Sequence, residues 1–287
     1  MNLTASFYAL GAIALWVSVA SLGVLLQHLP PFLLTGLSLL IGSLLALPKV
    51  LRDRGQWRIP LSTLALGIYG LFGYHFMLFM ALRLAPAVEA NLINYLWPLL
   101  MVVLAPLLLK NMRLRALHLG AGLLGFGGAA LAILGSGNAG SDAGVLLTGS
   151  AVWGYLAALA AAFMWSSYSL LTQRVAAFPT AAIGLFALVS GLLALLCHAA
   201  LEAPVNLNVR DWLLLTITGL GPLGGAFFLW DKALKLGDAR QIGILSYLTP
   251  LGSTALLIVV SGRAWSWSIA LAALMIMAAA GLGTRAR

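Results

Sequence analysis

The chain has 287 residues, of which 62% are hydrophobic and only 8% are charged. Soluble globular proteins carry about a quarter charged residues, so this composition excludes a soluble fold and indicates an integral membrane protein. A net charge of +9 would suggest nucleic-acid binding in a soluble chain. We expect no nucleic-acid partner here, because the basic residues lie in the short connections between apolar stretches.

Ten apolar stretches follow one another, each near the ~20 residues that cross a bilayer as a helix. They cover residues 5–27, 31–49, 61–82, 87–109, 116–135, 150–173, 180–200, 211–234, 239–261 and 265–284. Among the connections, only 136–149 has the Gly, Ser and Asp content of a flexible linker. The pattern predicts an all-α membrane protein of ten transmembrane helices, with one five-helix unit at 1–135 and another at 150–287.

Trp16 in the first span and His75 in the third lie well inside their apolar stretches. A buried indole needs a partner for its N–H, and a His within a span usually faces a cavity or a partner. Trp16 either lines a pocket or only packs helix against helix. His75 either binds a carboxylate or carries a proton, or it is a neutral side chain bonded to a backbone carbonyl.

The fourth span carries a polar face that ends in a proline. Asn91, Asn94, Tyr95 and Pro98 fall within an arc of about 100° on a helix. Pro98 cannot donate a hydrogen bond to the carbonyl of Asn94, so a free acceptor is expected there. In a bilayer such groups are satisfied by protein, water or ligand, which predicts a cavity lining. The alternative is a kinked helix whose polar residues bind neighbouring helices.

Glu89 and Trp97 flank this polar face. An acid in the first turn of a helix is favoured by the helix dipole, so Glu89 either caps the helix or serves in proton coupling or in attracting an amino group. Trp97 precedes the expected kink and either lines the cavity or belongs to the aromatic belt at the membrane interface.

The second half presents similar residues. Trp165 lies well inside the sixth span, as Trp16 does in the first. In the ninth span Ser246, Tyr247 and Pro250 again place a polar side chain, a Tyr and a proline on one face, with a free carbonyl expected at Ser246. Near the inner end of the eighth span, Asp231 and Lys232 are expected to act as a cytoplasmic gate pair.

These similarities belong to an internal repeat. The segment ALRLAPAVEANLINYLWPL, which begins at Ala81, recurs 152 residues later as ALKLGDARQIGILSYLTPL. Trp16 and Trp165 match at an offset of 149. Because five spans is an odd number, the second copy enters the membrane from the opposite face, which predicts inverted repeats and alternating access.

The charges give the expected orientation. If the N-terminus is cytoplasmic, 13 of the 16 Lys and Arg residues lie in inside segments, and only Arg83, Arg210 and Arg263 lie outside. Cytoplasmic connections carry such an excess of basic residues. Both termini are therefore predicted to be cytoplasmic.

Ten spans in two inverted repeats, with a Trp in the first span of each half and ALRLAPAVEANLINYLWPL joining the third span to the fourth, resemble the drug/metabolite transporter superfamily and its EamA-type exporters. The whole chain looks most like the YddG-type aromatic amino acid exporters. The resemblance implies a multi-pass carrier of monomer size in the bacterial inner membrane. It also implies a small-molecule substrate, lipid surroundings, and no cofactor or metal.

We therefore expect an aromatic amino acid to bind near the midplane. The residues expected to contact it are Trp16, His75, Asn91, Asn94, Tyr95, Trp97, Trp165, Ser246 and Tyr247, with Pro98 and Pro250 as hinges. One alternative is a multidrug exporter of the same superfamily, in which Glu89 would control transport of a lipophilic cation. A channel is a second alternative. A membrane-embedded enzyme would need a nucleophile, metal cluster or acid pair that the sequence does not display.

Overall fold

The computed structural model describes residues 2–85, 87–109, 115–134, 149–261 and 267–285. Regular secondary structure in these residues is helical throughout. Its α-helices are α1 (Leu3–Val17), α2 (Val19–Leu25), α3 (Pro31–Ser43), α4 (Leu47–Arg52), α5 (Leu61–Ile68), α6 (Tyr74–Leu84), α7 (Ala87–Asn94), α8 (Trp97–Leu108), α9 (Ala116–Leu134), α10 (Gly149–Leu171), α11 (Ala182–Leu201), α12 (Val209–Leu220), α13 (Ala226–Leu236), α14 (Ala239–Leu245), α15 (Leu248–Ser261) and α16 (Trp267–Arg285).

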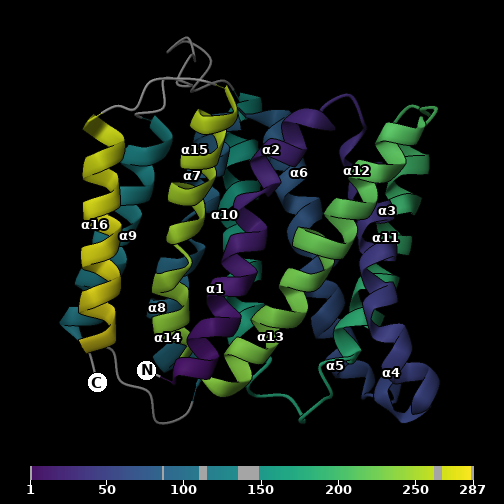
Figure 1. Ribbon diagram of the computed structural model, residues 1–287, viewed down its shortest axis with the longest axis horizontal. Helices are drawn as coiled ribbons and strands as arrows, with labels where there is room; N and C mark the ends of the chain where they lie inside the picture. Colours follow the sequence, from purple (N-terminus) through teal and green to yellow (C-terminus); the bar gives the residue numbers. More distant parts are fainter. Residues whose placement is uncertain (1, 86, 110–114, 135–148, 262–266, 286–287) are drawn as a thin grey trace.

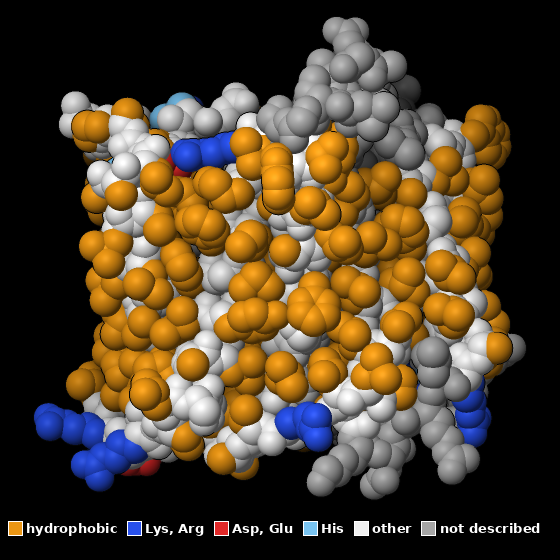
Figure 2. Space-filling model, turned by 180° about the vertical axis from the view of Figure 1, so that it is seen from behind, with side chains coloured by type: hydrophobic (Ala, Val, Ile, Leu, Met, Phe, Trp, Pro, Cys, Tyr) orange, Lys and Arg blue, Asp and Glu red, His pale blue; other side chains and the backbone are white. Residues whose placement is uncertain are grey.

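Several helical stretches are long and apolar enough to cross a membrane. Seven helical stretches of the described chain meet this requirement in length and composition, from Leu3–Leu25 to Val209–Leu236. Two shorter apolar helices, Ala116–Leu131 and Ala270–Leu282, accompany them. Hydrophobic side chains cover the middle of the face shown in Figure 2, with Lys and Arg side chains toward its edges. The chain is thus an all-α, multi-pass membrane protein.

The helices stand side by side in one bundle (Figure 1). We call the end at which α1 begins and α16 ends the lower end, as it is drawn, and the opposite end the upper end. At one side of the bundle α9 packs against α16, and at the other side α3 packs against α11. Between these pairs, α1 packs against α13 and α10 packs against α6 and α8.

The contact between α3 and α11 depends on small residues. A methyl group on Gly36 would lie 3.1 Å from the carbonyl oxygen of Gly191, and one on Gly184 would lie 3.0 Å from that of Ser43. Two helix backbones can approach this closely only where the side chain is a hydrogen atom. The two halves of the chain are therefore in direct backbone contact along this seam.

Two pairs of irregularities interrupt the helices. The first pair separates α7 from α8 at residues 95–96, just before Pro98, and α14 from α15 at residues 246–247, just before Pro250. The second pair consists of π-helical turns, Tyr69–Gly73 between α5 and α6, and Gly221–Gly225 between α12 and α13. The π-helical turns were not expected from the sequence, and such turns occur frequently at functional sites.

Outside the spans, Asp238 begins α14 by accepting a hydrogen bond from the backbone N–H of Arg240 at 2.8 Å. Partial burial raises the pKa of this carboxyl, but the hydrogen bonds and charge of Arg240 outweigh it and hold the pKa below its usual value. The carboxylate is thus ionised near neutral pH and complements the positive end of the helix dipole.

Candidate functional site

Five aromatic side chains meet at the centre of the bundle. We call Trp16, Trp97, Trp165, Phe227 and Trp230 the central aromatic cluster; they come from α1, α8, α10 and α13. The ring centroids of Trp16 lie 5.8 Å from Trp165 and 5.2 Å from Trp230, and Trp97 lies 5.7 Å from Trp230. Most pairs meet edge to face or tilted, the geometry that aromatic rings prefer. The rings are therefore packed against one another, in an arrangement where a flat ligand ring would find similar neighbours.

The sequence predicted three members of this cluster and missed two. Trp16, Trp97 and Trp165 lie together as expected, and Trp165 is 4% exposed. Phe227 and Trp230 were not singled out, although a spacing of three residues places them on one face of α13. Trp230 is 1% exposed and donates its indole N–H to Ser169 Oγ at 3.1 Å.

The π-helical turns supply acceptors for one ring of the cluster, Trp16, and for one ring beside it, His75. Trp16 donates its indole N–H to the carbonyl of Pro222 at 3.1 Å. His75 Nδ1 lies 2.6 Å from the carbonyl of Leu71, which is the alternative in which His75 binds a backbone carbonyl. When Nδ1 donates, Nε2 of the neutral ring is an acceptor. The ring of His75 lies 6.3 Å from that of Phe227, so this acceptor borders the cluster.

A polar pair adjoins the cluster on another side. The ring of Tyr74 lies 5.4 Å from Trp165, and Asn94 Nδ2 donates to the Tyr74 hydroxyl at 3.2 Å. Asn94 is 4% exposed, and its Oδ1 has no hydrogen-bond partner among the described residues. A buried acceptor without a partner is unfavourable, so this oxygen is free to accept a hydrogen bond from water or from a bound molecule. The pair therefore combines an open acceptor with a hydroxyl whose own proton is available for donation.

Three other residues that the sequence singled out lie in the fourth span. Tyr95 and Asn91 are half-buried on the same helix face as Asn94. The backbone of Glu89 belongs to α7, but its side chain lies outside the described residues.

The ninth span does not mirror the fourth at side-chain level. Tyr247 packs against Ala129 and Ile276 of α9 and α16, away from the central aromatic cluster. Ser246 Oγ donates to the carbonyl of Gly243 at 2.5 Å. The carbonyl of Ser246 accepts the backbone N–H of Thr249 at 2.9 Å, so the expectation of a free carbonyl there was wrong. The reason is that the helix ends before Pro250 and turns, which brings a different N–H to this oxygen.

The expected pair of Asp231 with Lys232 is replaced by another. Asp231 Oδ2 accepts from Lys235 Nζ at 2.6 Å and from Thr180 Oγ1 at 2.7 Å. Lys232 Nζ lies instead 5.0 Å from the ring centroid of Tyr8. Residues four apart share a helix face whereas adjacent residues do not, which explains the exchange.

A groove of about 330 Å³ opens beside α13, lined by Leu45, Lys49, Thr180, Phe228 and Lys232 among others. Phe228 and Lys232 lie on a different face of α13 from Phe227 and Trp230. The groove and the central aromatic cluster are thus separated by a single helix.

Membrane-length helices that hold aromatic rings and an open polar atom inside the bundle are features expected of a membrane transporter. The chain belongs to the EamA-like transporter family, which matches residues 3–134 and again residues 152–284. Its family and curated relatives are transporters and not enzymes.

The chain is 40% identical to the aromatic amino acid exporter YddG of Ancylobacter novellus over 285 residues, which cover 98% of this chain and 97% of the relative. It is 27% identical to the aromatic amino acid exporter YddG of Salmonella typhimurium, over 95% of this chain and 94% of that protein. A solved crystal structure that is 37% identical superimposes with a TM-score of 0.90 and covers 99% of each chain.

Proposed function

We propose that this protein exports aromatic amino acids across the bacterial inner membrane by alternating access. The observation that carries the proposal is the central aromatic cluster, to which helices of both halves contribute. The relative from Ancylobacter novellus, which aligns over nearly the whole chain, is named as an aromatic amino acid exporter. A cluster of indole and phenyl rings provides contact surface for a substrate ring of the same kind.

The architecture we propose is ten transmembrane helices in two inverted five-helix repeats. The match of the family to residues 3–134 and to 152–284 supports it. So do the π-helical turns, which begin at Tyr69 and Gly221 at the same offset of 152 as the sequence repeat. The contacts between the two halves also come in matched pairs. Helix α1 packs on α13 and α15 of the second half, and α10 packs on the corresponding α6 and α8 of the first half. Exchanging the halves leaves this set of contacts unchanged, as a twofold relation requires.

Substrate recognition follows from the groups beside the cluster. The side chain of the amino acid would take the place of ring–ring contacts among Trp16, Trp165 and their neighbours. Its ammonium group would donate to Asn94 Oδ1 and to Nε2 of His75, and its carboxylate would accept from the Tyr74 hydroxyl. Asn91 of α7 and Tyr95, which follows α7 at the break, would complete the surface.

Transport then requires the rings of the central aromatic cluster to move apart, so that the site opens to one face of the membrane at a time. The breaks at residues 95–96 and 246–247, ahead of Pro98 and Pro250, lie in spans four and nine and give each span a hinge. The excess of basic residues in the connections predicted to be cytoplasmic supports a cytoplasmic location for the lower end of the bundle.

Counterflow in proteoliposomes tests this proposal. Vesicles preloaded with unlabelled phenylalanine should accumulate labelled phenylalanine transiently, with saturation at millimolar substrate or lower. Tryptophan and tyrosine should compete, whereas alanine and a quaternary amine should not. Saturable flux that only the quaternary amine inhibits would favour the drug exporter, and flux without counterflow would favour the channel.

A further inference from the structure

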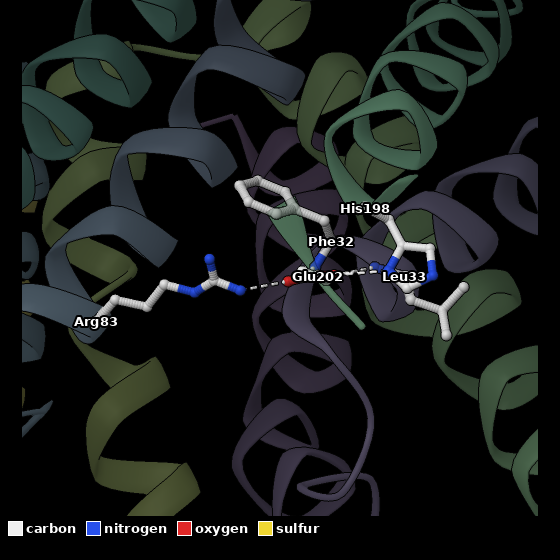
Figure 3. A network of polar contacts seen from close by, with 5 residues as sticks. All are labelled: Phe32, Leu33, Arg83, His198 and Glu202. Carbon is white, nitrogen blue, oxygen red and sulfur yellow. Dashed lines mark hydrogen bonds and ion pairs between the residues drawn. The ribbon is translucent and has the colours of Figure 1, made fainter. Parts of the chain in front are cut away.

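Four hydrogen-bond donors converge on one buried carboxylate (Figure 3). It follows the last residue of α11, at the upper end of the bundle (Figure 1). Glu202 Oε1 accepts from Arg83 Nη2 at 2.8 Å and from the backbone N–H of Phe32 at 3.0 Å. Glu202 Oε2 lies 2.9 Å from His198 Nδ1 and accepts from the backbone N–H of Leu33 at 3.2 Å. The side chain of Glu202 is only 1% exposed.

This carboxylate joins three helices from both halves of the chain. Phe32 and Leu33 form the first turn of α3, Arg83 lies at the end of α6, and Glu202 follows the last residue of α11. The guanidinium of Arg83 also lies 5.7 Å from the ring centroid of Phe32. Each partner favours the negative charge of Glu202, because two are cations or potential cations and two are free N–H groups at a helix N-terminus.

A corresponding cluster lies at the lower end of the bundle. Lys235 ends α13 as Arg83 ends α6, at an offset of 152 residues. Its Nζ lies 2.6 Å from Asp231 Oδ2, 2.9 Å from the carbonyl of Phe178, and 4.1 Å from the ring centroid of Phe178. Thr180 donates to the same Asp231 oxygen at 2.7 Å, and the Asp231 side chain is 3% exposed. The cluster thus ties α13 to the chain that enters α11.

We propose that these two clusters are ionic latches that hold the two ends of the transport path shut. The outer latch is Arg83, His198 and Glu202 with the first turn of α3, and the inner latch is Asp231, Lys235 and Thr180. The inference rests on the proposed function, because alternating access requires each end to open in turn.

The physical argument concerns the burial of charge. A carboxylate held by several donors in a dry site is stable only while all of them stay in place. Separation of α6 from α3 and α11 would therefore expose Glu202 to water, and separation of α13 from the start of α11 would expose Asp231. Each latch favours the closed state of its own end, so weakening one latch shifts the population toward opening at that end.

Accessibility of a single cysteine next to the central aromatic cluster tests the latches. Ser167 is 3% exposed, and its Oγ lies 2.9 Å from the Tyr69 hydroxyl. The reporter is Ser167→Cys in a Cys197→Ser background, labelled in intact cells by a membrane-impermeant maleimide added outside. Glu202→Gln should raise the labelling rate about tenfold, and Asp231→Asn should lower it by a similar factor. Arg210→Gln, which removes an exposed cation at the same end, is the matched control and should leave the rate unchanged.

Arg83→Gln gives an independent test of the outer latch that keeps the carboxylate, and it should act in the same direction as Glu202→Gln. An unchanged rate in both outer-latch variants would overturn the proposal. So would an increase of similar size in Asp231→Asn, because it would indicate general loosening of the bundle. The labelling assay uses no substrate. If the labelling rates change as predicted but the protein shows no phenylalanine counterflow, only the substrate assignment is contradicted.

Discussion

At the scale of single residues, depth within a span was a good guide to which rings meet in the central aromatic cluster, and orientation within a span was not. Trp16, Trp97 and Trp165 are far from the predicted span ends or precede a proline, and all three belong to the central aromatic cluster. Phe227 and Trp230 escaped prediction because the run FFLW presents aromatic or aliphatic residues on every side of a helix. Only the neighbours in the fold select which of these rings faces the centre.

Tyr247 shows the opposite failure. Its match with Tyr95 in the repeat suggested that both line one site, yet Tyr247 packs between α9 and α16. A ring of Tyr247 size fits there because Gly125 of α9 offers no side chain; a methyl group on Gly125 would lie 2.8 Å from Tyr247 Cε2. A repeat thus predicts the matching of backbones better than the matching of side-chain contacts.

Replacement of Asn94 by Leu should impair recognition of the substrate amino group. We expect affinity for phenylalanine to fall about tenfold, because a hydrogen bond to a charged group is lost. The affinity for 3-phenylpropionate, which lacks the amino group, should change little. Inhibition of counterflow by each compound measures the two affinities. If the ratio of the affinity for phenylalanine to that for 3-phenylpropionate is the same as in the unmodified protein, Asn94 does not bind the ammonium group.

At the scale of elements, the apolar runs predicted where helices lie but not where they are interrupted. The breaks at 95–96 and 246–247 precede Pro98 and Pro250, which the sequence had identified as hinges. The π-helical turn Tyr69–Gly73 contains no proline, because an inserted residue in a helix changes the register without requiring one. The turn Gly221–Gly225 does contain Pro222, but nothing about this proline distinguishes a π-helical turn from an ordinary kink. Carbonyls of the two turns bind the rings of His75 and Trp16, so these turns help to place the site.

The close packing of α3 on the eighth span gives a prediction about stability. A methyl group on Gly42 would lie 2.7 Å from the carbonyl oxygen of Gly219 and 2.8 Å from Gly224 Cα, both of them backbone atoms. Gly42→Ala should therefore destabilise the fold by about 1–3 kcal/mol, since neither helix can move without disturbing the other. Thermal unfolding in detergent measures this as a lower transition temperature.

Gly120→Ala is the control for this substitution. A methyl group there would meet nothing within 4 Å, and alanine is the better helix former. Its transition temperature should equal or slightly exceed that of the unmodified protein. Equal transition temperatures for the two variants would mean that the backbone contact at Gly42 does not limit stability.

At the scale of the whole molecule, composition and charge were sufficient to predict an all-α membrane protein, which the apolar helices and the family match confirm. The arrangement of helices could not be predicted, because nearly every span is apolar all round and shows no single buried face. Contacts such as α3 with α11 and α9 with α16 depend on small residues at matched depths, which is a property of pairs of helices.

The proposed orientation can be tested with two exposed positions in a Cys197→Ser background. Arg54 follows α4 at the lower end and Asn206 precedes α12 at the upper end. An impermeant maleimide should label Asn206→Cys in intact cells and should label Arg54→Cys only after permeabilisation, because basic connections stay in the cytoplasm. Labelling of Arg54→Cys in intact cells would reverse the orientation.

The central claim is that the central aromatic cluster binds the transported amino acid, and counterflow by one double variant tests it most directly. Trp16→Ala with Trp165→Ala should reduce phenylalanine counterflow at least about tenfold, because both ring contacts with the substrate are lost. Trp153→Ala with Trp212→Ala removes two exposed tryptophans, at 68% and 47% exposure, and should leave counterflow unchanged. Undiminished counterflow by a folded Trp16→Ala and Trp165→Ala protein would contradict the account.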